Sequence, residues 1–202
     1  MTVRMPRPIW LPIESPDNPF PFEVLDCRAT CAALAATIRD DLATNAVASL
    51  VTIAEAVGAP TLPPDCVRGD PEIVVPSSAP DQSGPVIAES DVECRWSLRR
   101  IDRQFHARRR WTGQLIHVAD FVLRDGSVAI TGLGSRRDFV HNSFAYAAAE
   151  FAFLAETYIG GRLAAFPIPP RLRRDEPEKI AMSGWKTHGS AALFARFVPE
   201  LI

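Results

Sequence analysis

Between Val92 and Ser135 hydrophobic and polar residues alternate in four successive runs that short turn sequences separate. Asp125-Gly126 is a strong two-residue hairpin signal, and Thr112-Gly113 and Asp102-Arg103 are weaker ones. Because alternation with a period of two is typical of β-strands, the pattern predicts a four-stranded antiparallel meander over residues 92–135.

Two-residue turns would fix how these strands pair. Counting outward from each turn gives the cross-strand pairs Trp96–Arg109, Leu98–Ala107, Trp111–Gln114, Arg108–His117, Phe121–Ile130 and Arg124–Ser127. One face, the expected core side, then collects Cys94, Trp96, Leu98, Phe105, Ala107, Trp111, Ile116, Val118, Val122, Ala129 and Leu133. The opposite face collects Arg95, Ser97, Arg99, Gln104, His106, Arg108, Arg110 and His117, followed by Phe121, Leu123, Val128 and Ile130. Its apolar end requires a cover from elsewhere in the chain.

A strongly apolar run from Asn142 to Ile159 follows the predicted sheet. Asn142 or Ser143 can cap a helix there, and Gly160-Gly161 can end it. A helix that is apolar nearly all round is buried on more than one side. We therefore expect an α+β fold in which the meander packs on a buried helix at about 142–159 and N-terminal helices complete the layer.

The remaining segments are less regular, and the chain is expected to form one domain over residues 1–202. Residues 1–26 are rich in proline and predict an extended arm, which wraps the surface or serves in a homodimer. Helices are predicted from Arg28 to Ile38 and from Asp40 or Asp41 to Val57. Residues 59–91 predict a loop-rich segment with a short strand at Glu72–Val75, and the tail, 171–202, predicts a charged connector and a helix at Ser190–Val198.

The apolar content of 47% and the net charge of −2 indicate a globular protein. No uninterrupted apolar run suggests a membrane span, and the proline-rich start does not resemble a secretory signal. A cytoplasmic location is the resulting expectation. The cysteines Cys27, Cys31, Cys66 and Cys94 are then expected to be free thiols.

Charge is unevenly distributed along the chain. Residues 1–91 carry 5 basic and 13 acidic groups, whereas residues 92–137 carry 10 basic and 4 acidic groups. The candidate basic sheet face comprises Arg95, Arg99, His106, Arg108, Arg110 and His117. It could bind an acidic protein or nucleic acid, or the acidic half could neutralise it. Nucleic acid is the less favoured partner, because base stacking needs aromatic residues on the basic face and the expected register places Trp96, Phe105 and Trp111 on the other.

Two pairs of side chains have residue types that can bind a metal ion. His106 and His117 would be neighbours on the basic face, but no carboxylate joins them and the arginines would repel a cation. Cys27 and Cys31 have helical spacing without the two further ligands that zinc requires. No metal or cofactor is therefore expected.

The segment from Gly132 to Arg137 precedes the predicted helix and is the most site-like stretch. Backbone amides at a helix N-terminus can hold an anion, so Gly134, Ser135, Arg136, Arg137 and His141 form a candidate anion site, with His141 as a base if the protein is an enzyme. The sequence patterns of phosphate loops, dinucleotide-binding turns, nucleophile elbows, zinc proteases and zinc deaminases are absent.

The run Arg109-Arg110-Trp111-Thr112-Gly113, followed by an apolar strand, resembles an Arg-x-Trp-Thr-Gly pattern in bacterial proteins of unassigned function. The resemblance covers about 40 residues and implies no substrate or catalytic residue. By exclusion, the sequence favours a non-catalytic protein-interaction module, similar to an immunity protein or adaptor, with an unidentified protein partner. A small anion-handling enzyme or ligand-binding protein is the alternative.

Overall fold

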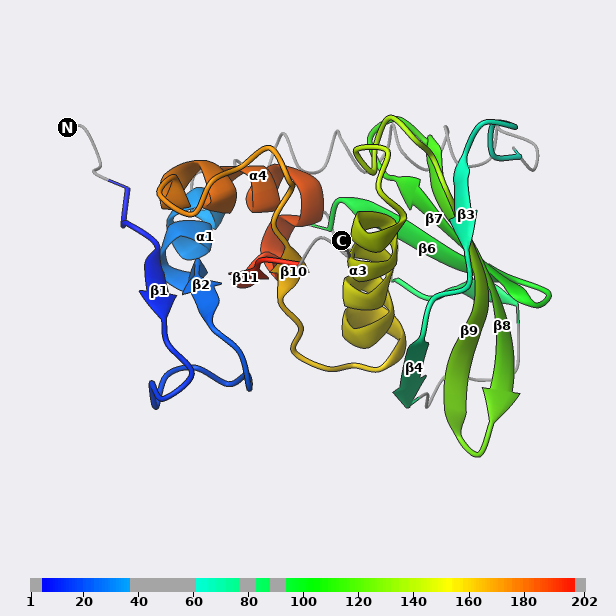
Figure 1. The fold of residues 1–202 in the computed structure, drawn as a ribbon, viewed down its shortest axis with the longest axis horizontal. Helices are drawn as coiled ribbons and strands as arrows, with labels where there is room; N and C mark the ends of the chain where they lie inside the picture. Colours follow the sequence, from blue (N-terminus) through cyan, green and yellow to red (C-terminus); the bar gives the residue numbers. More distant parts are fainter. Residues whose placement is uncertain (1–4, 37–60, 77–82, 88–93, 199–202) are drawn as a thin grey trace.

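The computed structural model describes residues 5–36, 61–76, 83–87 and 94–198. Figure 1 shows helix α3 (Phe144–Leu154) between two groups of elements, a sheet from the middle of the chain and a smaller group built from both chain ends. The α+β class predicted from the sequence is confirmed. The helix expected up to Val57 lies outside the described residues.

The larger sheet is antiparallel and has seven strands, which extends the predicted meander on both sides. Its strands are β3 (Val67–Gly69), β4 (Ile73–Pro76), β5 (Gly84–Pro85), β6 (Trp96–Ile101), β7 (Gln104–Arg109), β8 (Leu115–Arg124) and β9 (Ser127–Ser135). Strands β6 to β9 form the expected meander, β5 pairs with β6, and both β3 and β4 pair with β9. The strand expected at 72–75 is present as β4, but the prediction of only four strands was wrong.

Two of the three hairpin turns keep the expected pairing. Trp96 pairs with Arg109 across β6 and β7, and Phe121 pairs with Ile130 across β8 and β9. Asp102 and Asp125 have positive φ values of 53° and 48°. Such backbone angles are typical of two-residue hairpin turns, in which Asp is tolerated.

The turn between β7 and β8 differs from the prediction, with consequences for the faces of the strand that follows it. Four residues, 110–113, form the loop, because the Arg109 amide donates to the Gln114 carbonyl at 2.9 Å. This longer loop alone would shift the pairing by two residues and leave the faces unchanged. A β-bulge after Ala107 then shifts the pairing back by one residue, so that Arg108 faces Leu115 but Ala107 faces His117, a net slip of one residue from the expected register. A slip of one residue exchanges the two faces of a strand.

The exchange places a different set of side chains in the core. Ala119, Phe121, Val128 and Ile130 are buried, and Val118, Val122 and Ala129 are half-buried. Trp111, expected in the core, is 43% exposed. In contrast, Trp96, Leu98, Phe105, Ala107, Ile116 and Leu133 are buried as predicted.

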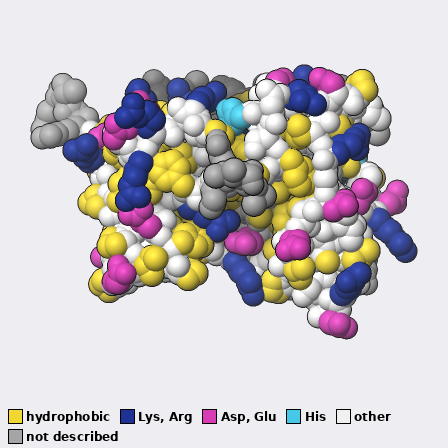
Figure 2. Space-filling view, viewed as in Figure 1, with side chains coloured by type: hydrophobic (Ala, Val, Ile, Leu, Met, Phe, Trp, Pro, Cys, Tyr) yellow, Lys and Arg dark blue, Asp and Glu magenta, His cyan; other side chains and the backbone are white. Residues whose placement is uncertain are grey.

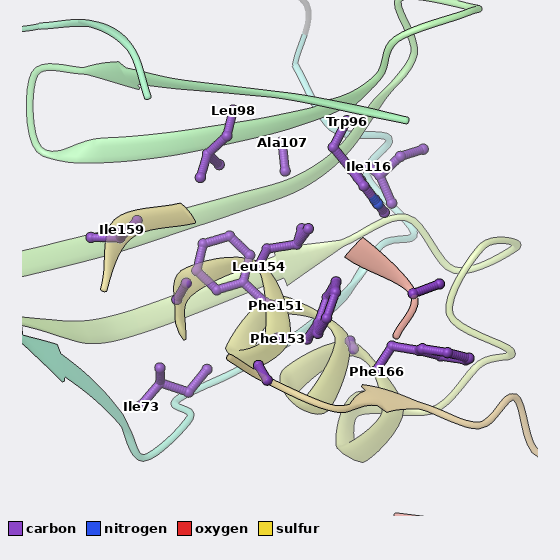
Figure 3. Packing of buried hydrophobic residues seen from close by; sticks show 14 of the residues in the cluster. Ile73, Trp96, Leu98, Ala107, Ile116, Phe151, Phe153, Leu154, Ile159 and Phe166 are labelled. Carbon is purple, nitrogen blue, oxygen red and sulfur yellow. The ribbon is translucent and has the colours of Figure 1, made fainter. Parts of the chain in front are cut away.

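Helix α3 lies on the inner face of the sheet, as the apolar run predicted. Ser143 caps it by accepting from the Tyr146 amide at 3.1 Å, and a π-helical turn, η1 (Ala155–Ile159), continues it to Gly160. Figure 3 shows Phe151 and Leu154 facing the side chains of Leu98, Ala107 and Trp96 from the sheet. Burying a side chain of this size contributes about 1.5–3 kcal/mol, so this contact is a main source of stability.

The second group of elements joins the two ends of the chain. Its mixed four-stranded sheet has the order β1 (Ile9–Leu11), β2 (Val24–Asp26), β11 (Phe194–Arg196), β10 (Phe166–Pro167), with β10 and β11 parallel. Helices α1 (Arg28–Ala35) and α4 (Pro177–His188) lie beside it (Figure 1), and a short 3-10 turn, η2 (Gly189–Ala191), leads from α4 towards β11.

This second sheet corrects two expectations. The arm over 1–26 contributes strands rather than a surface wrap, and β2 is central because its three residues contain no proline. The tail forms helix α4 where a connector was expected, and strand β11 where a helix was expected at Ser190–Val198. Pro177 at the start of α4 is well tolerated in the first helical turn.

Candidate functional site

A cluster of polar side chains is buried where the large sheet, α3 and α4 meet. Glu150 of α3 is 1% exposed and accepts from His117 Nε2 of β8 at 3.2 Å. The other nitrogen of His117, Nδ1, lies 2.8 Å from Ser135 Oγ of β9. An ionised carboxylate only accepts hydrogen bonds, so His117 donates from Nε2 to Glu150, while Nδ1 and the Ser135 hydroxyl share the second hydrogen bond.

Arg109 and His188 complete this buried cluster. The Arg109 guanidinium lies 3.8 Å from Glu150, 3.9 Å above the centre of the Trp96 ring, and donates to the Thr187 carbonyl of α4. His188 accepts from Trp96 Nε1 at 3.2 Å, and its Nε2 lies 3.9 Å from Glu150. The cluster therefore ties β7, β8, α3 and α4 together through charge-assisted contacts.

The charges of the cluster compensate one another. Burial alone would raise the pKa of Glu150, but the hydrogen bond from His117 and the positive charge of Arg109 hold this pKa below its ordinary value. Burial lowers the pKa of His188 to about 3, although Glu150 acts in the opposite direction. Glu150 is thus ionised and His188 neutral near pH 7.

Ser135, His117 and Glu150 have the residue types of a nucleophile, a base and an orienting acid. All three are at most 1% exposed. A substrate has no access to the hydroxyl in this arrangement. The geometry supports a structural role, in which each buried polar group satisfies another.

The candidate basic face is only partly assembled. Arg95, Arg99 and Arg108 are half-buried, and Arg99 pairs with His106 across β6 and β7. His106 and Arg110 are 9% exposed. His117 is fully buried in the cluster around Glu150, so its expected place on this face was wrong, because the bulge turns it inward.

Trp111 lies at the end of this face, on the loop between β7 and β8. The Arg95 guanidinium stacks over its ring at 5.2 Å, and the ring is 43% exposed. The loop is braced from both sides: Arg108 donates to the Gly113 carbonyl at 3.1 Å, and the Thr112 hydroxyl accepts from the Gln114 amide at 3.3 Å. A large aromatic ring is thus held near solvent by its neighbours.

The residues of the predicted anion site are separated in the structure. Gly134 and Ser135 are buried in β9. Arg136 donates to Asp138 at 3.0 Å and to the side-chain oxygen of Gln114, while Arg137 donates to the Asp65 carbonyl at 2.8 Å. Within the described chain both arginines are therefore engaged with protein groups. Anion binding by these residues stays a prediction.

His141 lies apart from those arginines, next to the first turn of α3. Its φ of 54° is unusual for a residue other than glycine, and its ring packs edge-on against Tyr146 at 5.0 Å. Burial and the charge of Arg171 lower the pKa of His141, so it is neutral near pH 7. Tyr146 also lines a cavity of about 230 Å³.

Sequence reasoning missed the cluster around Glu150 because its members come from five elements, β7, β8, β9, α3 and α4. The one available signal was Glu150 itself, a charged residue in the middle of an otherwise apolar helix. A charge at such a position requires a partner, since burying an isolated charge is costly.

Comparisons with protein-family models, curated proteins and solved structures gave no match for this chain. Among the described residues, no group of three or more His, Cys, Asp or Glu side chains is arranged to hold a metal ion. The four cysteines are free and buried, and burial raises the pKa of Cys31 to about 11. No helix in the described ranges is long and apolar enough to cross a membrane.

Proposed function

We propose that this protein is a non-catalytic interaction module, similar to an adaptor or immunity protein, that binds an acidic protein partner through the loop at Trp111. The observation that carries the proposal is the exposed Trp111 ring stacked by Arg95 on a braced loop. Tryptophan and arginine are the residue types most enriched among those that dominate binding energy at protein interfaces. Holding the ring in place reduces the entropy lost on binding.

Charge around the loop determines the kind of partner. Arg95, Arg108 and Arg110 lie on or beside it, and Arg99 follows on the same face. Arg99 contributes to lowering the pKa of Arg108, after burial, so the positive charges oppose one another. A carboxylate-bearing partner surface would relieve this repulsion and raise the association rate.

Nucleic acid is the competing partner, because Trp111 is an aromatic residue on the basic face after all. Binding to single strands typically uses several stacking platforms along a positive groove. Trp96 and Phe105 are buried, so Trp111 is the one exposed aromatic side chain of β6, β7 and the loop between β7 and β8. The net charge of −2 also disfavours a nucleic-acid partner.

The test compares Trp111→Ser with Leu123→Ser, which changes an apolar residue that is 48% exposed at the far end of the same sheet. A partner is captured by cross-linking, purified, and titrated against each variant. We expect Trp111→Ser to weaken binding at least about 30-fold and Leu123→Ser by less than about 3-fold. If the two variants bind the partner with equal affinity, the Trp111 loop is not the binding site. If nucleic acid is recovered and its binding depends on Trp111, the partner is nucleic acid and not a protein.

A further inference from the structure

The cavity at the N-terminal end of α3 is bounded by three segments that are distant in sequence. Ser143, Ala145 and Tyr146 come from the start of α3, Ile168, Pro170 and Leu172 from the chain after β10, and Phe197 and Val198 from the chain after β11. Figure 2 shows hydrophobic side chains over both groups of elements on the face viewed there. The walls from Ile168, Leu172 and Phe197 suit an apolar ligand.

Tyr146 is a polar residue in the lining of the cavity. Its side chain is 4% exposed. Burial raises the pKa of Tyr146, so the hydroxyl is protonated at neutral pH and can donate to a ligand.

The electrostatic surroundings favour a negative ligand group. Arg171 stands between two lining residues in the sequence, and its charge lowers the pKa values of both His141 and Tyr146. The backbone amides at the start of α3 add partial positive charge. Glu150, one turn further along α3, opposes an anion, but the Arg109 guanidinium lies 3.8 Å from it and compensates its charge.

Size limits the ligand further. An apolar cavity of about 150 Å³ accommodates benzene, and this cavity measures about 230 Å³. We infer that it binds a small aromatic monocarboxylate, with the ring against Phe197 and Leu172 and the carboxylate between the Tyr146 hydroxyl and Arg171. This inference is independent of the proposed partner at Trp111.

Phenylacetate is the probe for a calorimetric titration, with amide chemical shifts recorded in parallel. We expect a Kd of about 0.1–1 mM, typical of a ligand with so few atoms, and shifts at residues 143–146 and 168–172. The neutral analogue phenylacetamide should bind about 5- to 10-fold more weakly, because it lacks the charge that Arg171 attracts.

Three variants distinguish this site from general binding. Tyr146→Phe keeps the ring and should weaken phenylacetate about 3- to 10-fold. Arg171→Gln should remove the preference for phenylacetate over phenylacetamide. The control, Arg173→Gln, changes an exposed arginine paired with Asp175 and should leave the Kd within about 2-fold. The inference would be overturned if phenylacetate caused no saturable shifts at residues 143–146 and 168–172 below about 10 mM. Equal affinity of the unmodified protein for phenylacetate and phenylacetamide would also overturn it.

Discussion

Two arginines stack on two tryptophans along the same pair of strands, with opposite surroundings. Arg109 covers Trp96 at 3.9 Å in the core, next to the buried Glu150, whereas Arg95 covers Trp111 at 5.2 Å on a loop near solvent. The inner pair contacts α3 and α4 and has a countercharge. The outer pair exposes its ring. The same contact therefore stabilises the fold in one place and, in our proposal, serves binding in the other.

Glu150→Gln tests the inner pair with the largest expected effect. The substitution keeps the shape of the side chain but leaves the guanidinium of Arg109 without a countercharge in the core. Removing one partner of a buried charged pair costs about 3–5 kcal/mol, which urea unfolding would measure as a lower midpoint. Glu156→Gln, in the half-buried π-helical turn that follows, is the control and should cost less than about 1 kcal/mol.

The pH dependence of stability tests the same cluster through His188. In the unfolded chain His188 binds a proton below about pH 6.5, whereas in the folded protein its pKa is about 3. Between about pH 6.5 and pH 3 the unfolded state therefore binds more protons than the folded state, so the free energy of unfolding falls as the pH is lowered through this range. We expect His188 to account for a loss of about 2 kcal/mol between pH 6.5 and 5.

His188→Gln provides the control for this pH effect. Glutamine does not titrate and can still accept from Trp96 Nε1 through its side-chain oxygen. The free energy of unfolding should then vary less steeply between pH 6.5 and 5. An unchanged slope would show that the buried neutral histidine is not its source.

Ser135→Ala should have a smaller effect, because it removes only the hydrogen bond to His117 Nδ1. A loss of about 1 kcal/mol in the free energy of unfolding is expected for one such buried bond. Ser127→Ala, in the half-buried first residue of β9, is the matched control. A catalytic role for Ser135 would instead require access, and labelling of its hydroxyl by a serine-directed fluorophosphonate would contradict the buried arrangement.

The parts of the fold that the sequence predicted depend on local signals. Asp125-Gly126 specified its hairpin, and the apolar run after Ser143 specified α3. The second sheet escaped prediction because Leu25 pairs with Ala195, far away in the chain, and no local pattern reports such a contact.

The candidate site depended on a single residue of register. Thr112-Gly113 suggested a two-residue turn, but the structure uses a four-residue loop and a bulge after Ala107. The sequence contains no pattern that announces this bulge. As a result Trp111 was expected inside and His117 outside, whereas the structure places them the other way round.

The most direct test of the contrast is one substitution made at both tryptophans, Trp96→Phe and Trp111→Phe, followed by denaturant unfolding. Trp96→Phe removes the donor to His188 and leaves a small cavity, so it should cost about 2–3 kcal/mol. Trp111→Phe should change the free energy of unfolding by less than about 0.5 kcal/mol, because its ring is largely at the surface. Similar losses for the two variants would contradict the account, since Trp111 would then be part of the stabilising structure and not a ring held ready for a partner.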